Sequence, residues 1–206
     1  MNWLAHVLLS SQQIDFQLGN YLADPLKCQV WSGATRELID GVNTHKSIDS
    51  FTDSDKIVSL SKSRLRKKGL LKPVIIDLTY DYLLTQHWDS FCTVSRREFL
   101  SSFNNAGEQR ALEFPQKPQE LVLSLVQNDR LNRYNTLEEL LQGFGRIDTR
   151  LSPRLLAKET ASGYYDDVVK NIGAIEEDFL IFFPKLIHHI REDLRLVDIE
   201  HLIFNG

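Results

Sequence analysis

The sequence is poor in the residues and runs that mark several classes of protein. Its 206 residues include only two cysteines, Cys28 and Cys92, which are not arranged as CxxC. Two such cysteines predict no disulfide framework and favour a reducing, cytoplasmic compartment. No apolar run reaches the ~18–20 residues that span a bilayer. The first residues carry neither a basic leader nor a small-residue cleavage site, so we expect no signal peptide and no membrane partner.

Charge and short motifs exclude further classes. The formal net charge is −4 with 25% charged residues, which argues against a chain-wide affinity for nucleic acid. The motifs HExxH, GxSxG, GxGxxG and the P-loop are all absent. Any chemistry must therefore come from residues that are dispersed along the chain. The sequence alone gives no oligomeric state.

Helical periodicity dominates the sequence. Ten glycines and six prolines leave room for long helices, and apolar residues recur at spacings of three and four. The first predicted helix begins near residue 3. Capping boxes at Ser95 and Thr136 predict the start of two more helices. The other predicted helices cover roughly 16–23, 35–52, 55–68, 73–87, 118–131 and 162–194. We predict one all-α domain over 1–206, a helical bundle with its site in 1–92 and completing helices in 93–206. Asn2 is the predicted N-cap of the first helix. Residues 143–152 are the most plausible flexible joint, although we expect no domain boundary there.

Two polar residues stand in unexpected places in the first 25 positions. His6 is embedded in the apolar run 3–9, and Asp24 ends a helix just before Pro25. A carboxylate at a helix C-terminus is disfavoured by the helix dipole, so we expect a cation near Asp24. Each residue also has a simpler interpretation: a packing histidine with a backbone partner, and a helix-end carboxylate bonded to its own turn.

Two further sets follow helical spacing. His45, Asp49 and Asp53 are four residues apart along one face, and Asp77 and Asp81 form a similar pair among apolar neighbours. Buried paired carboxylates require a cation or a shared proton. The Asp77–Asp81 pair is therefore the strongest single indication of a metal or an internal arginine. A solvated polar stripe remains the alternative for Asp49 and Asp53.

Together, His6, Asp24, His45 and Asp81 make a mixed nitrogen and oxygen ligand set. Such donors suit Mn²⁺, Fe or Mg²⁺, or Zn²⁺ with an open position. A second feature is a run of basic residues from Lys56 to Lys72, with no acid between Lys56 and Ile76. It predicts either a solvated helix face or a dock for an acidic protein or a phosphate-bearing ligand.

Four blocks resemble the acyl carrier protein phosphodiesterase family: 1–6 (MNWLAH), 19–24 (GNYLAD), 41–53 (GVNTHKSIDSFTD) and 77–88 (DLTYDYLLTQHW). The family is similar to HD-domain phosphohydrolases, which are all-helical and metal-dependent. The resemblance implies hydrolysis of 4′-phosphopantetheine from holo acyl carrier protein, usually with Mn²⁺, while Mg²⁺ or Fe²⁺ are alternatives. Because acyl carrier proteins are strongly acidic, it also implies that the basic run receives them.

The resemblance assigns roles residue by residue. It implies His6, Asp24, His45 and Asp81 as metal ligands, Asp24, Asp77 and Lys46 as catalytic residues, Asp49 and Asn20 as support, and Lys62, Arg64, Arg66, Lys67 and Lys68 as the partner-binding residues. Two positions depart from the family pattern. Lys46 stands where an arginine is common, which loses a bidentate phosphate grip, and Tyr82 stands where a histidine is common.

Two other functions stay open from the sequence. One is a non-catalytic helical module that binds an acidic protein through the basic run. The other is an HD-like hydrolase of a small nucleotide or phosphodiester, which would turn over its substrate without a carrier protein.

Overall fold

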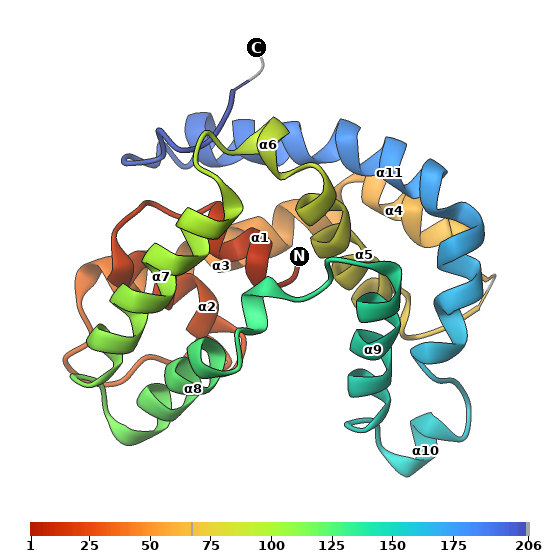
Figure 1. Cartoon of the computed structure of the whole chain (residues 1–206), viewed down its shortest axis with the longest axis horizontal. Helices are drawn as coiled ribbons and strands as arrows, with labels where there is room; N and C mark the ends of the chain where they lie inside the picture. Colours follow the sequence, from red (N-terminus) through yellow and green to blue (C-terminus); the bar gives the residue numbers. More distant parts are fainter. Residues whose placement is uncertain (67, 205–206) are drawn as a thin grey trace.

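The computed structural model describes residues 1–66 and 68–204, and helices account for its regular structure (Figure 1). The helices are α1 (Trp3–Leu8), α2 (Ile14–Ala23), α3 (Arg36–Ser54), α4 (Lys56–Arg64), α5 (Lys72–Gln86), α6 (Trp88–Phe91), α7 (Arg96–Ala111), α8 (Gln116–Gln127), η1 (Arg130–Asn132), α9 (Leu137–Asp148), α10 (Pro153–Leu156), η2 (Ser162–Tyr164), α11 (Tyr165–His188) and η3 (His189–Asp193). Among the described residues there is no β-strand, only one isolated bridge between Cys92 and Leu202. The all-α prediction is confirmed.

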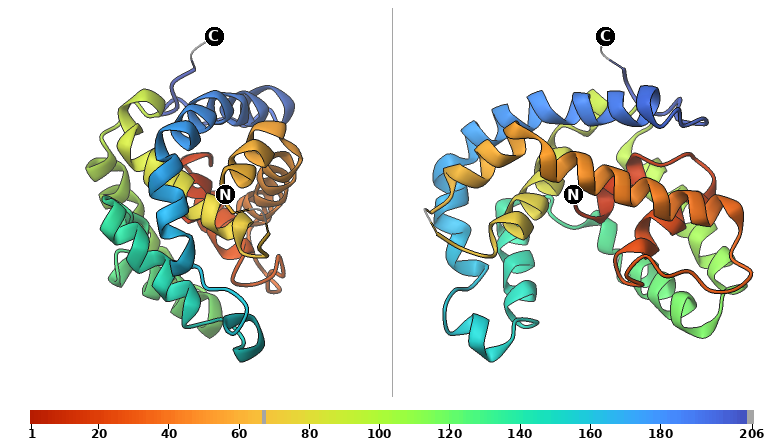
Figure 2. Two further views of the ribbon diagram at one scale, coloured as in Figure 1. Left: turned by 90° about the vertical axis from the view of Figure 1, so that its right-hand side faces the viewer. Right: turned by 180° about the vertical axis from the view of Figure 1, so that it is seen from behind.

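The chain forms two arms around its first residues. Helices α2, α7 and α8 lie on one side, α9 and α10 lie on the other, and the N-terminus lies between them (Figure 1). From behind, α3 runs across the middle of the molecule and connects the two sides (Figure 2). Side chains on α1, α3 and α5 therefore meet near the centre.

Helices α2 and α3 cross at two glycines. A Cβ atom on Gly19 would lie 2.1 Å from the backbone oxygen of Leu38, and one on Gly41 would lie 2.1 Å from that of Phe16. No side chain fits at either position, so both glycines are required for the two backbones to touch. This close crossing brings Asn20 of α2 into the same region as His45 and Asp49 of α3.

An aromatic core joins α11 to α5 and α6. The ring centroids of Tyr80 and Phe179 are 5.2 Å apart, and those of Phe91 and Phe183 are 4.8 Å apart. Pro184 lies inside α11 rather than ending it.

Asn2 is the N-cap residue of α1, as predicted, although its side chain makes no capping hydrogen bond. One further expectation needs correction. The predicted joint at 143–152 lies largely within α9, where Gly143 is buried. A glycine-containing segment was therefore misread as flexible, although its glycine permits close packing. Among the described residues, no helix is both long enough and apolar enough to cross a membrane.

Candidate metal centre

Asp49 lies between two histidines at the centre of the molecule. One of its carboxylate oxygens is 3.1 Å from Nε2 of His6, and the other is 3.1 Å from Nε2 of His45. The two imidazole rings stack with centroids 4.0 Å apart and an interplanar angle of 21°. Donor atoms of these three residues all lie within 4.8 Å of one another, the one such set of histidine, cysteine and carboxylate donors in 1–66 and 68–204.

Asn20 fixes the orientation of His6. Its amide nitrogen donates to the backbone oxygen of His6 and to Oγ of Ser10, both at 2.9 Å. The amide oxygen is therefore left to accept from Nδ1 of His6, at 2.9 Å. This network places the proton of the neutral ring on Nδ1 and leaves Nε2 with a free lone pair.

The free lone pair of His6 faces an oxygen of Asp49, which is also an acceptor. Burial lowers the pKa of His6 to about 4, so the ring is neutral near pH 7 and has no proton to place between them. Burial alone would raise the pKa of Asp49, but the two neighbouring histidines and the amino group of Met1 outweigh burial and hold that pKa well below its usual range. Two acceptor atoms 3.1 Å apart repel each other unless a cation binds the lone pairs of both. The residues therefore fit a metal ion.

His45 presents the same chemistry from α3. It is almost fully buried, and within the described part of the chain its Nδ1 has no hydrogen-bond partner. A ring with one unpartnered nitrogen is free to place its proton on either atom, and so can offer Nε2 as a ligand. Its spacing of four residues from Asp49 puts both side chains on one face of α3.

A cleft of about 290 Å³ opens beside this cluster. Its polar lining consists largely of His45 and four carboxylates, Asp24, Asp49, Asp53 and Asp77. The amino group of Met1 lies 3.5 Å from Asp49 and 3.4 Å from Asp77, so a positive charge is stable between these two side chains. Burial raises the pKa of Asp77 despite this cation.

Asp24 lies at the rim of the cleft. It is exposed, and its Oδ2 accepts a hydrogen bond from the indole nitrogen of Trp3 at 3.1 Å. The indole therefore holds the carboxylate over the cleft, outside the three-residue cluster. The role of Trp3 was missed from the sequence, where it is indistinguishable from a core residue, and so was that of Ser10.

Asp81 lies beneath the cleft and caps α1. Its two oxygens accept from the backbone nitrogens of Leu4 and Ala5, at 3.3 and 3.4 Å. These are donors of the first helical turn, which has no partner within the helix. Burial raises the pKa of Asp81 to about 7. The structure thus separates Asp81, which positions the helix that carries His6, from the residues that surround the cleft.

The other predicted site residues lie elsewhere. Lys46 is exposed, and its amino group is 3.5 Å from Asn43 on the outer face of α3 rather than in the cleft. Tyr82 is also not among the residues that line the cleft, and burial and then the charge of Glu176 on α11 raise its pKa. The departure from histidine at Tyr82 therefore leaves the cluster intact.

Most of the predicted basic surface is paired with acids. Arg64 makes two hydrogen bonds to Asp178, at 2.6 and 2.9 Å. Arg66 pairs with Asp167 at 3.0 Å, and Lys62 pairs with Asp53 at 3.2 Å. Lys68 is exposed, and Lys67 lies outside the described residues. The run has no acid within it, so the local sequence gave no sign that acids from other helices pair with its basic residues.

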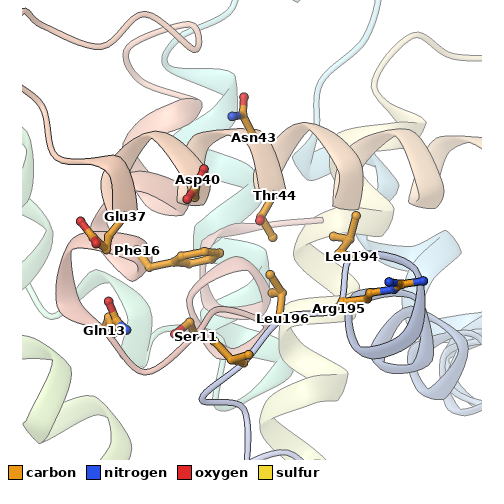
Figure 3. Close-up of a pocket in the computed structure, with 11 residues that line it drawn as sticks. Ser11, Gln13, Phe16, Glu37, Asp40, Asn43, Thr44, Leu194, Arg195 and Leu196 are labelled. Carbon is orange, nitrogen blue, oxygen red and sulfur yellow. The ribbon is translucent and has the colours of Figure 1, made fainter.

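A second hollow lies on another side of α3 (Figure 3). Its volume is about 420 Å³, and Phe16, Thr44 and Leu196 lie around it. It contains no histidine, and its acids Glu37 and Asp40 do not converge on a shared partner. The smaller cleft is the better candidate because it alone adjoins the His6, His45 and Asp49 cluster.

Comparisons with known proteins assign the chain to one family. The chain matches the family described as acyl carrier protein phosphodiesterase over residues 1–186. Proteins named acyl carrier protein phosphodiesterase from Pectobacterium atrosepticum and Photorhabdus laumondii are 25% and 26% identical to it. The alignments cover 91% of this chain and 96% and 93% of those proteins. The protein of that name from Yersinia pestis is 26% identical. No solved structure matches the chain.

Proposed function

Because this chain belongs to the acyl carrier protein phosphodiesterase family, we propose that it hydrolyses the phosphodiester joining 4′-phosphopantetheine to a serine of holo acyl carrier protein. Water supplies the new P–O bond, the serine oxygen leaves with a proton, and the products are the apo carrier protein and 4′-phosphopantetheine. The observation that carries the proposal is the convergence of His6, His45 and Asp49 beside a cleft of carboxylates.

A divalent metal is part of this proposal, with Mn²⁺ first and Mg²⁺ or Fe²⁺ as alternatives. His6, His45 and Asp49 would hold it, because their donor atoms converge and the Nε2 lone pair of His6 faces a carboxylate oxygen. When bound, such an ion lowers the pKa of a water ligand and stabilises charge on phosphoryl oxygens. Asn20 holds the His6 ring in the ligating tautomer.

The remaining carboxylates divide the proton transfers between them. Asp24 is exposed at the rim and oriented by Trp3, so it accepts the proton of the attacking water. Asp77 lines the same cleft, so it is placed to give a proton to the leaving serine oxygen. Lys46 has no part in this assignment, because its amino group lies on the outer face of α3.

We also propose that the protein works in the cytoplasm. Cys28 and Cys92 are both free thiols, and a reducing compartment preserves them.

The reaction is tested with purified holo acyl carrier protein, with and without added Mn²⁺, by mass spectrometry of the carrier protein. We expect a metal-dependent mass loss equal to the prosthetic group. His45→Ala should abolish this loss while the variant keeps its far-UV circular dichroism spectrum. No mass loss from a well-folded sample at high enzyme concentration would refute the proposed reaction.

A further inference from the structure

Four arginines gather beside the candidate cleft without a carboxylate partner. Arg130 lies in η1, Arg133 follows it, Arg146 lies in the last turn of α9, and Arg150 comes just after that helix. Within residues 1–66 and 68–204, none of the four forms an ion pair. Two acids of α9 are engaged elsewhere: Glu139 accepts hydrogen bonds from Asn135, and Asp148 accepts from the backbone nitrogen of Ser162.

Two sets of contacts connect the arginines to the cleft. On one side, burial raises the pKa of Tyr21 to about 12, against the charge of Arg130 and together with that of Asp24. The Tyr21 ring stands edge-on to Trp3, with ring centroids 5.3 Å apart. Both Asp24 and Trp3 line the cleft.

On the other side, Tyr134 joins Arg146 to the cleft wall. The Arg146 guanidinium lies 5.9 Å from the centre of the Tyr134 ring. A Cβ atom on Gly143 would meet both that ring and the side chain of Leu78, which lines the cleft. The arginines therefore extend from the Asp24 side of the cleft to its Leu78 side.

The folded chain bears a cost for holding these charges together. Burial, and then the charges of Arg146, Arg130 and Arg150, lower the pKa of Arg133. Arg130 donates to Oγ of Ser124 at 2.6 Å, but its buried Nε has no partner in the described part of the chain. A helix C-terminus favours Arg146 and Arg150, yet it gives no reason for Arg130 and Arg133 to lie beside them.

We infer that Arg130, Arg133, Arg146 and Arg150 form the docking surface for the acidic face of the protein substrate. This inference rests on the proposed function and replaces the basic run 56–72 as the surface that receives the carrier protein. The four arginines extend from η1 through the following segment and α9 to the turn after it, which is wider than one phosphate group requires. Charges of this kind steer encounter and strengthen the complex, with a marked dependence on salt.

The test removes two charges that the fold does not need. The double variant Arg133→Ala/Arg150→Ala is assayed with holo carrier protein and with bis(p-nitrophenyl) phosphate, a small diester without a protein. We expect KM for the carrier protein to rise by roughly tenfold or more and its salt dependence to weaken, because both contacts are electrostatic. kcat and hydrolysis of the small diester should change less than about twofold, since neither arginine lines the cleft.

A matched control is Lys56→Ala/Lys68→Ala, which removes two exposed charges from the basic run. Its KM should equal that of the wild type. The docking surface is refuted if both double variants behave alike, or if the arginine variant loses activity equally on the small diester.

Failure of the proposed reaction is distinguished by calorimetric titration with apo carrier protein, which requires no turnover. Binding by the wild type that the arginine variant loses supports the surface even if no mass loss occurs. A wild-type chain that does not bind the carrier protein refutes the surface, while activity on the small diester then reports on the cleft alone.

Discussion

Asp49 reaches His6 and His45 with a different oxygen each, at 3.1 Å in both cases. His6 comes from α1 and His45 from α3, so the carboxylate joins two helices that are distant in sequence. Because Asn20 directs the proton of His6 away from Asp49, this junction is held without a shared proton. The proposed metal ion would complete this junction, and the first prediction concerns Asn20, the residue that orients His6 for it.

Asn20→Ala should weaken metal binding by about 10- to 100-fold, because residues that orient a ligating histidine have effects of that size. The variant lets His6 rotate and removes the acceptor for its Nδ1 proton. Isothermal titration with Mn²⁺ measures the change. Ser10→Ala is the control, since it leaves the Asn20–His6 bond in place and should weaken binding much less. Equal affinities for Asn20→Ala and the wild type would remove Asn20 from the account.

Gly143→Ala and Gly145→Ala should change stability in opposite directions. A Cβ atom on Gly143 would lie 2.5 Å from the Tyr134 ring, whereas one on Gly145 would have nothing within 4 Å. We expect Gly143→Ala to lower the unfolding free energy by about 1–3 kcal/mol through overpacking. Gly145→Ala should raise it by up to ~1 kcal/mol through helix propensity. Urea unfolding measures both, and shifts of the same sign would contradict the packing of Tyr134 against α9.

Arg64→Ala should destabilise the fold rather than weaken carrier-protein binding. Asp178 is 4% exposed and is held by Arg64 and by Ser61, at 2.8 Å. Removing the arginine leaves a buried carboxylate without its cation, at a cost of roughly 2–3 kcal/mol. Lys62→Ala is the control, because its partner Asp53 is 75% exposed and the pair contributes little. Unchanged stability together with weaker carrier-protein binding would return Arg64 to the docking surface.

Asp81→Asn should make stability less sensitive to pH. Folding raises the pKa of Asp81 from 3.8 to about 7, mainly through burial. Between these values the folded chain keeps a proton that the unfolded chain releases, so the wild type loses stability as pH rises from about 4 to 7. The variant has no such proton, and its deficit relative to the wild type should shrink by a few kcal/mol across that window.

Thermal unfolding of the chelated protein at pH 4.5, 6 and 8 measures that deficit. Asp89→Asn changes an exposed carboxylate nearby and serves as the control, with an expected deficit that is the same at each pH. A deficit for Asp81→Asn that is constant or grows with pH would mean that Asp81 is ionised in the fold at pH 4.5.

Local sequence rules predicted the helices better than the site. The capping boxes at Ser95 and Thr136 and the spacing of His45 and Asp49 depend on neighbours along one helix, and both capping serine and threonine side chains bond as expected. The pairing of Arg64 with Asp178 spans 114 positions, and no local pattern encodes it. The sequence therefore presented a free basic run where the fold has ion pairs.

The same limit applies to the ligands. Periodicity put His45 and Asp49 on one face of a helix but could not rank Asp49 above the other carboxylates. What sets Asp49 apart is its place beside residues from other helices. That arrangement depends on how the helices pack, as in the close crossing of α2 and α3 at Gly19 and Gly41, and not on spacing along α3. The burial expected of Asp81 is observed, whereas its contact with the first turn of α1 depends on a helix 76 positions away.

The most direct test of the central claim is a titration of the chelated protein with Mn²⁺, followed by electron paramagnetic resonance and electron spin echo envelope modulation. We expect one tight site per chain with ¹⁴N couplings from His6 and His45. Asp49→Asn and His45→Ala should lose that site, while Lys46→Ala keeps it. Tight Mn²⁺ binding without ¹⁴N coupling, or wild-type affinity in Asp49→Asn, would show that His6, His45 and Asp49 do not form the metal centre.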